Sequence, residues 1–164
     1  MIGHSELVAR AKRWLKNTKK CVVVLSEVTA YHLNEFPDAV GWLPNGESIL
    51  VECKTTRSDF TRDKNKPVHQ GHRGLGAYRY FMVPPVGRDG QTVTFPGDTR
   101  LPDGWGVIVF SGKRVSVAKE ATHRDTMVEA RGHPAVRQRR DAELALLVAE
   151  LRRYQSGYRG VDNT

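Results

Sequence analysis

The chain has 164 residues, and 26 Lys and Arg against 18 Asp and Glu give it a formal net charge of +8 at pH 7. This length fits one domain, which we expect to span residues 1–155, with a frayed tail over residues 156–164. Cys21 and Cys53 give no disulfide framework, and no apolar run approaches the roughly 20 residues of a membrane span. A reducing cytoplasm without membrane contact is therefore the expected setting.

Positive charge is concentrated on either side of an acidic segment. Residues 1–20 contain six Lys or Arg and one acid, and residues 54–79 contain seven and two. Residues 21–53 contain five acids and no Lys or Arg. Basic surfaces neutralise phosphates and release counterions, and an acidic centre among them is suited to a divalent cation. The pattern favours a nucleic acid partner; a basic surface that serves solubility alone is the alternative.

The first two elements are an expected helix and an expected strand. Residues 3–16 predict a helix with Ser5 as its N-cap and an apolar face of Leu7, Val8, Ala11, Trp14 and Leu15. Its other face carries Arg10, Lys12, Arg13 and Lys16, which either lie in solvent or contact phosphates. Residues 21–28, rich in β-branched side chains, predict a strand.

Residues 34–54 predict a β-hairpin, because Asn45-Gly46 tolerates the positive φ of a tight turn. Side chains alternate along its second strand, so Glu52 and Lys54 share one face. That strand is otherwise apolar, and its terminal charges therefore need partners. The turn brings Asp38 back beside them, and two adjacent carboxylates are stabilised by a shared proton or a divalent cation. Mg²⁺ fits, since it is bound by one or two carboxylates and water.

The remaining elements complete an α/β pattern. We expect a helix over 59–66 capped by Ser58, strands over 78–83, 104–110 and 115–118, and a mobile glycine-rich loop over 68–77. A last helix, from Pro134 to about Tyr154, is expected to pack a stripe against the sheet or, less simply, against a second copy. That stripe consists of Val136, Leu144, Leu147, Val148, Leu151 and Tyr154.

Pro37-Asp38, followed after thirteen residues by Glu52-Cys53-Lys54, resembles the signature of the PD-(D/E)XK nuclease superfamily. The segments 52–60, 63–64, 78–84 and 101–107 further resemble MmcB-like DNA repair proteins and related phage-encoded nucleases, over roughly residues 20 to 120. The chain departs from that pattern at Ala77-Tyr78-Arg79, where an acidic residue and an arginine usually precede the aromatic pair. The resemblance implies an α/β fold with a restriction-endonuclease-like mixed β-sheet of about five strands, flanked by the first and last helices.

The same resemblance implies a metal-dependent nuclease that hydrolyses DNA phosphodiester bonds in DNA repair, recombination or phage DNA processing, with RNA as the other substrate class. Asp38, Glu52 and the backbone carbonyl of Cys53 would hold Mg²⁺, or Mn²⁺ in its place. Lys54 would orient the attacking water and oppose charge on the phosphorane. The cytoplasm would be that of a bacterium or a phage-infected host cell.

Further residues are expected around this set. Glu6, Glu27 and Glu35 are candidate accessory acids. The expected nucleic acid contacts are Thr55, Arg57, Arg62, Lys64, Lys66 and Arg73. His69 and His72 are not assigned to zinc, because no neighbouring Cys or His completes four ligands.

Two other functions stay open at this point. One is a nucleic-acid-binding accessory protein that keeps the nuclease fold without catalysis. The other is an interaction module in which Glu52 and Lys54 form only a structural ion pair. The sequence also leaves a monomer and a homodimer open.

Overall fold

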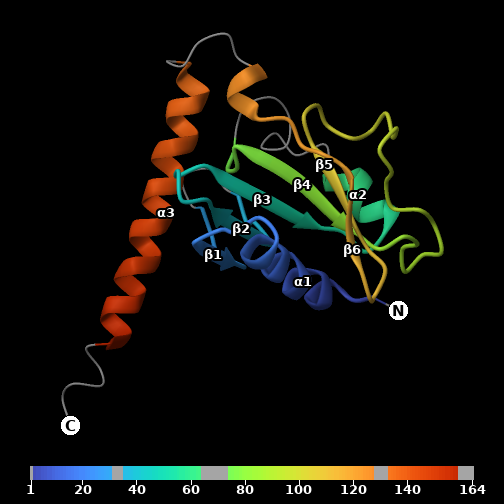
Figure 1. The fold of residues 1–164 in the computed structure, drawn as a ribbon, viewed down its shortest axis with the longest axis horizontal. Coiled ribbons are helices and arrows are strands. Elements are labelled where there is room, and N and C mark those ends of the chain that lie inside the picture. Colours follow the sequence, from blue (N-terminus) through green and yellow to red (C-terminus); the bar gives the residue numbers. More distant parts are fainter. Residues whose placement is uncertain (1, 31–34, 64–73, 128–132, 159–164) are drawn as a thin grey trace.

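The computed structural model describes residues 2–30, 35–63, 74–127 and 133–158. These residues form a six-stranded mixed sheet, whose strands lie side by side in chain order (Figure 1). The strands are β1 (Val23–Ser26), β2 (Ala39–Trp42), β3 (Ser48–Cys53), β4 (Tyr78–Val83), β5 (Gly106–Phe110) and β6 (Val115–Lys119). β3, β4 and β5 run parallel, and the other neighbours pair antiparallel. The predicted mixed α/β fold is confirmed, with six strands instead of about five.

Helices cover both faces of the sheet. α1 (His4–Asn17) buries the five apolar side chains that the sequence predicted, in one cluster with Ile49, Val51 and Cys53 of β3. The other face packs against α2 (Arg57–Asp63) and α3 (Pro134–Tyr158), since Phe60, Ala142 and Leu146 share a cluster with Leu50. The two faces of β3 therefore belong to two separate cores. Among the described residues, no helix is both long and apolar enough to cross a bilayer.

The predicted hairpin is confirmed by β2 and β3. Their antiparallel register pairs Ala39 with Val51 and Trp42 with Ser48. In the connecting turn, Leu43 N donates to Glu47 O at 2.8 Å, and Gly46 adopts a φ of 83°. Glycine adopts this left-handed conformation without the steric cost of a Cβ, which explains the Asn-Gly turn.

Several predicted boundaries were wrong by a few residues, including the starts of β1 and β5, which lie at Val23 and Gly106 in place of residues 21 and 104. α1 begins after Gly3, which is therefore its N-cap in place of Ser5. The hydroxyl of Thr56, not Ser58, caps α2, because Thr56 Oγ1 accepts the Asp59 N–H at 3.1 Å. β1 ends before Glu27, because a φ of 53° takes this residue out of the extended region.

The apolar stripe of α3 packs only in part. Of the predicted stripe, Val136 is buried and Leu147 is partly buried. Ala142 and Leu146, which the predicted stripe did not include, are also buried. The helix has 25 residues and extends for roughly 37 Å, so its C-terminal half passes beyond the sheet (Figure 1). The expected packing was wrong for four side chains, which are 40–72% exposed: Leu144, Val148, Leu151 and Tyr154. The helix also continues to Tyr158, three residues into the expected tail.

The glycine-rich segment before β4 is buried where the structure describes it. Residues 74–77 are buried, which corrects the expected mobile loop at these positions; residues 68–73 lie outside the described residues. Gly74 and Gly76 both have a φ of 85°. A Cβ on Gly76 would lie 2.7 Å from the Cβ of Leu50, and one on Gly74 would overlap the Arg79 guanidinium. Close packing, in addition to backbone conformation, requires glycine at both positions.

A buried charge cluster lies beneath this segment. The Arg79 guanidinium lies 3.6 Å from Glu35 Oε1, and its Nε donates to Leu75 O at 2.7 Å. Burial lowers the pKa of Arg79 to about 10, and Glu35, Glu52 and Glu143 oppose this shift. Burial raises the pKa of Glu35, and Arg79 opposes that shift. Each charge therefore stabilises the ionised form of the other.

We expect Arg79→Met to lower the free energy of unfolding by about 3–5 kcal/mol, because it leaves the Glu35 carboxylate buried without its cation. The loss should shrink as the pH falls, since Glu35 without Arg79 is best buried in its protonated form. Urea unfolding at several pH values measures both effects. Glu35→Gln/Arg79→Met is the matched control and should recover much of the loss; a single variant as stable as wild type would contradict the prediction.

Candidate functional site

The three predicted catalytic residues lie at the same end of β2 and β3. Asp38 directly precedes β2, whereas Glu52 is the penultimate residue of β3 and Lys54 directly follows that strand. The antiparallel register pairs Ala39 with Val51, so the next step along both strands places Asp38 opposite Glu52. The strand pairing therefore brings together residues that thirteen positions separate in the sequence.

Asp38 links three elements at this end of the sheet. Its Oδ2 accepts the backbone N–H of Cys53 at 2.7 Å. Its Oδ1 lies 3.1 Å from Nε2 of His4, in the first turn of α1. The Asp38 side chain is only 16% exposed. Sequence reasoning missed His4, because no motif marks it and only the packing of α1 brings its ring to the carboxylate.

Glu52 and Lys54 form a largely buried ion pair. Lys54 Nζ lies 3.1 Å from Glu52 Oε2, and the two side chains are 11% and 5% exposed, respectively. Arg79 lies on the neighbouring strand, paired with Leu50, and Glu52 is among the carboxylates that raise its pKa. Glu52 therefore lies in the field of two cations on one face of the sheet.

The Cys53 thiol is influenced by both carboxylates, Asp38 and Glu52. Burial raises the pKa of its thiol well above the ordinary value, and Asp38 and Glu52 raise it further, while Lys54 lowers it. A thiol in this environment stays protonated and is not a nucleophile. Its side chain packs in the core beneath α1, so Cys53 contacts Asp38 through its backbone alone.

The donor chemistry at this end of the sheet fits Mg²⁺. In the described part of the chain, no three His, Cys, Asp or Glu side chains are placed to hold a metal ion together. Mg²⁺ does not require three, because it is commonly bound by one or two carboxylates with water in the other positions. Asp38 and Glu52, with the Cys53 carbonyl, would supply an all-oxygen set of that kind.

The three candidate accessory acids have different surroundings. Glu27 is exposed, and its N–H donates to the carbonyl of Asp38 at 3.2 Å, so it directly neighbours the site. Glu6 is exposed in the first turn of α1, two residues after His4. Glu35 is 2% exposed and accepts the Leu75 N–H at 2.6 Å within the buried charge cluster. Position therefore favours Glu27.

The expected nucleic acid contacts are only partly on the surface. Thr55 is buried, and its carbonyl accepts the Arg88 N–H at 2.8 Å. Arg57 Nη1 donates to Thr92 O at 2.8 Å, which anchors the segment between β4 and β5. Arg62 is exposed and pairs with Asp59 at 2.9 Å. The other three, Lys64, Lys66 and Arg73, lie outside the described residues.

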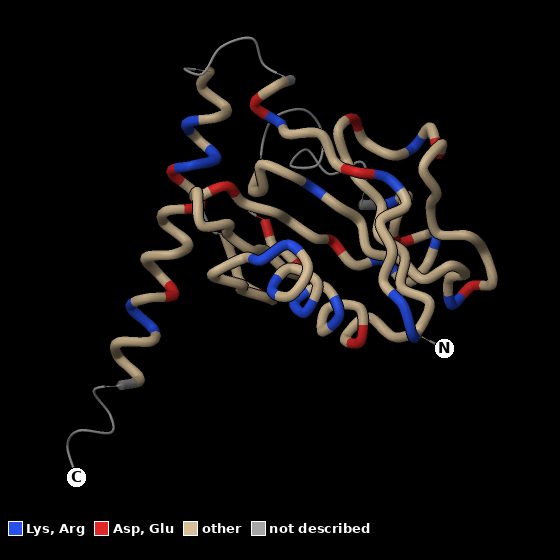
Figure 2. The backbone as a smooth tube through the Cα atoms, in the orientation of Figure 1, with Lys and Arg blue, Asp and Glu red and all other residues tan. Residues whose placement is uncertain are grey.

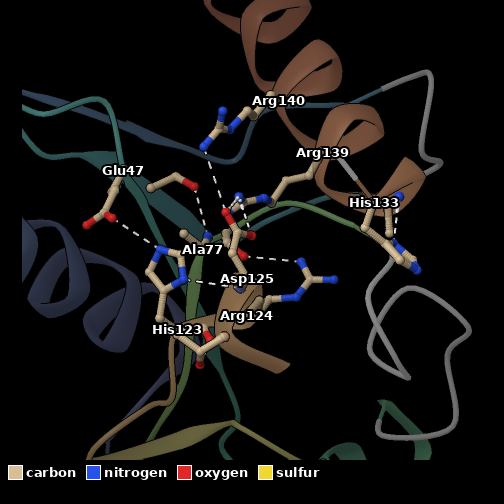
Figure 3. A network of polar contacts seen from close by, with 12 residues as sticks. Glu47, Ala77, His123, Arg124, Asp125, His133, Arg139 and Arg140 are labelled. Atoms are coloured by element: carbon tan, nitrogen blue, oxygen red, sulfur yellow. Dashed lines mark hydrogen bonds and ion pairs between the residues drawn. The ribbon is translucent and has the colours of Figure 1, made fainter. Parts of the chain in front are cut away.

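A second polar group lies at the opposite end of the hairpin, beside a cavity of about 370 Å³ between the β2–β3 turn and α3 (Figure 3). His123 Nε2 lies 3.1 Å from Glu47 Oε1, and His123 Nδ1 accepts the Asp125 N–H at 3.1 Å. Arg139 donates to Asp125 at 2.8 Å. These groups satisfy one another and attach the start of α3 to the sheet, so we assign them a structural role.

Comparisons with known proteins give the fold and no activity. No family model matches the chain, and no curated protein matches it. Among solved structures, it is similar to the SPO1766 protein of unknown function from Silicibacter pomeroyi, with a TM-score of 0.61 and 19% sequence identity. That likeness covers 99% of this chain and 96% of the other. At this identity the likeness concerns the fold alone.

Glu27→Gly should unfold at a higher temperature than Glu27→Ala, because a φ of 53° is strained for any residue with a Cβ and is free of strain for glycine. The expected difference is about 1 kcal/mol, measured by thermal unfolding of the two variants side by side. Both variants lack the carboxylate, so any equal change between them reports the loss of charge. A less stable glycine variant would argue against backbone strain at this position.

Proposed function

We propose that this protein is a Mg²⁺-dependent nuclease that hydrolyses phosphodiester bonds of DNA. The observation that carries the proposal is the convergence of Asp38, Glu52 and Lys54 at the end of β2 and β3, around the Cys53 amide. The resemblance of these residues to the PD-(D/E)XK signature supports it. A role in DNA repair, recombination or phage DNA processing, in the cytoplasm, belongs to the same proposal.

The residues of the chain divide the work. Asp38, Glu52 and the Cys53 carbonyl would hold the cation. The hydrogen bond from Cys53 N to Asp38 Oδ2 orients the Asp38 carboxylate, whose Oδ1 lies beside His4. When bound, Mg²⁺ polarises the phosphoryl oxygen and lowers the pKa of a bound water. Lys54 is held beside Glu52, where its ammonium would orient an attacking water and stabilise negative charge at the reacting phosphate.

The charged groups of the site are held in place by burial and by contacts with the backbone, which suits this chemistry. Glu52 and Lys54 are both largely buried, and Asp38 is tied to the backbone of the neighbouring strand. Preorganised charges stabilise a transition state because they need no reorganisation when the reaction occurs. The basic composition of the chain, with a net charge of +8, complements a polyanionic substrate.

Asp38→Asn, Glu52→Gln and Lys54→Met should each lower Mg²⁺-dependent cleavage by at least about a hundredfold, the usual effect of removing one preorganised charge. Asp38→Asn is the most specific test of the three, because it removes the charge while the amide oxygen of asparagine can still accept the Cys53 N–H. The measurement is a cleavage panel of linear, forked and single-stranded DNA and of RNA, with Mg²⁺ or Mn²⁺ present and withheld.

Glu47→Gln is the matched control, because Glu47 is a carboxylate of the same hairpin that lies in the connecting turn, at the end away from the site and beside His123. It should cut at the wild-type rate. Unfolding curves of all variants separate loss of chemistry from loss of fold. Unchanged cutting by the three site variants would refute the proposal, and binding without any cutting would favour the accessory protein that keeps the fold without catalysis.

A further inference from the structure

The outer face of α1 carries exposed cations that the fold does not use. Lys12, Arg13, Lys16 and, just beyond the helix, Lys20 are all exposed. Within the described residues, none of these four forms an ion pair with a carboxylate. Two neighbouring cations do have partners: Lys19 lies 3.5 Å from Glu120, and the Arg10 guanidinium lies 4.8 Å from the ring centroid of Phe110. The unpaired cations therefore form a distinct group, here called the α1 basic row.

The α1 basic row opposes the stability of its own helix. Lys12 and Lys16 are four residues apart, and Arg13 and Lys16 are three apart, so their side chains are neighbours on the helix surface. Like charges at these spacings repel and destabilise a helix. Glu6, the acid of this helix, lies in the first turn and is too far along the axis to neutralise them. A bound polyanion would remove this repulsion.

Lys20 adds a second, independent cost. Its φ is 61°, in the left-handed region, immediately after the chain turns at the end of α1 and Cys21 N donates to Leu15 O at 2.9 Å. Glycine is the residue most often found in this position, because it has no Cβ. The Lys20 side chain is exposed, so burial does not offset this strain. A strained, exposed cation is therefore kept where glycine would be more stable.

The position of the row connects it with the candidate site. α1 begins at the site, because His4 contacts Asp38 at 3.1 Å, and the helix then leads away from it. His4 and Lys16 are twelve residues apart, or roughly 18 Å along the axis, and Lys12 and Lys16 are roughly 6 Å apart. Figure 2 marks the Lys and Arg positions along this helix in blue. The row thus begins roughly 12 Å along α1 from His4, on the side of the sheet that α3 does not cover.

We propose that the α1 basic row binds the sugar-phosphate backbone of the nucleic acid on one side of the cleavage site. The inference rests on the proposed function, since it takes the same polymer as the partner. Lysines on a helix surface contact phosphates as point charges without reading bases, so this contact supplies affinity and direction and no sequence preference. It deepens the proposal by assigning the substrate path to α1.

The test is fluorescence anisotropy of labelled single-stranded and duplex DNA in EDTA, which prevents cutting. Lys12→Gln/Lys16→Gln should weaken binding by roughly eightfold per lost contact at 0.1 M salt, and should lower the slope of log K against log salt by about 0.7–0.9 per contact. Arg137→Gln/Arg152→Gln is the matched control, because both arginines are exposed on α3, which packs on the other face of the sheet. The control should bind as wild type does.

Lys20→Gly separates binding from stability. Removing the strained side chain should keep or raise the thermal unfolding midpoint, and should still weaken DNA binding by the factor expected for one contact. Loss of affinity in a variant of equal or higher stability has no explanation in partial unfolding. Unchanged affinity in Lys20→Gly and in Lys12→Gln/Lys16→Gln would overturn the inference, as would an equal loss in the α3 control.

Glu52→Gln, measured in the same assay, distinguishes this inference from the proposed function. It should bind DNA with the wild-type salt slope while failing to cut. If the row variants lose binding but no protein cuts DNA with Mg²⁺, the α1 surface stands and the nuclease assignment falls. If wild type cuts DNA and the row variants bind normally, the nuclease assignment stands and the α1 surface falls. A wild-type protein that binds neither DNA nor RNA would overturn the α1 surface directly.

Discussion

The hydrogen bond from the Cys53 amide to the Asp38 carboxylate, 2.7 Å long, is the contact on which the candidate site depends. It joins the residue that enters β2 to the residue that ends β3, and so fixes the end of the hairpin where Glu52 and Lys54 lie. The same carboxylate receives His4 from α1. One acidic side chain thus ties together two strands and the first helix, and the proposed catalytic set exists because all three meet there.

Charge is used differently on the two faces of the sheet. On the face shared with α3, Glu35 and Arg79 are buried and stabilise each other, so removing either is expected to be costly. On the α1 side, cations such as Lys12 and Lys16 are exposed, and within the described residues no carboxylate pairs with them. The first arrangement supports the fold, whereas the second is the surface that we propose for nucleic acid binding. The candidate site lies at the end of β2 and β3 where Asp38 and Glu52 are opposite each other.

Backbone strain coincides with charge in this chain. Among the described residues other than glycine, only Lys20 and Glu27 have positive φ, and both are charged and exposed. They lie at the two ends of the segment that leads from α1 through β1 toward Asp38. Strained residues persist where the surrounding structure holds them and where their side chains have a use. At both positions the chain therefore has a charged residue where glycine would cause less backbone strain.

Local pattern was sufficient for the hairpin and for the buried face of α1, because an Asn-Gly turn and a 3.6-residue apolar period act over short distances. It was insufficient for Glu35, an expected site acid that is buried opposite Arg79, and for Leu151 on α3, which is 56% exposed despite its place in an apolar stripe. His4 carried no signal at all. Periodicity predicts which side of an element is apolar, but only the packing of distant segments decides which neighbour that side meets and which charges share a site.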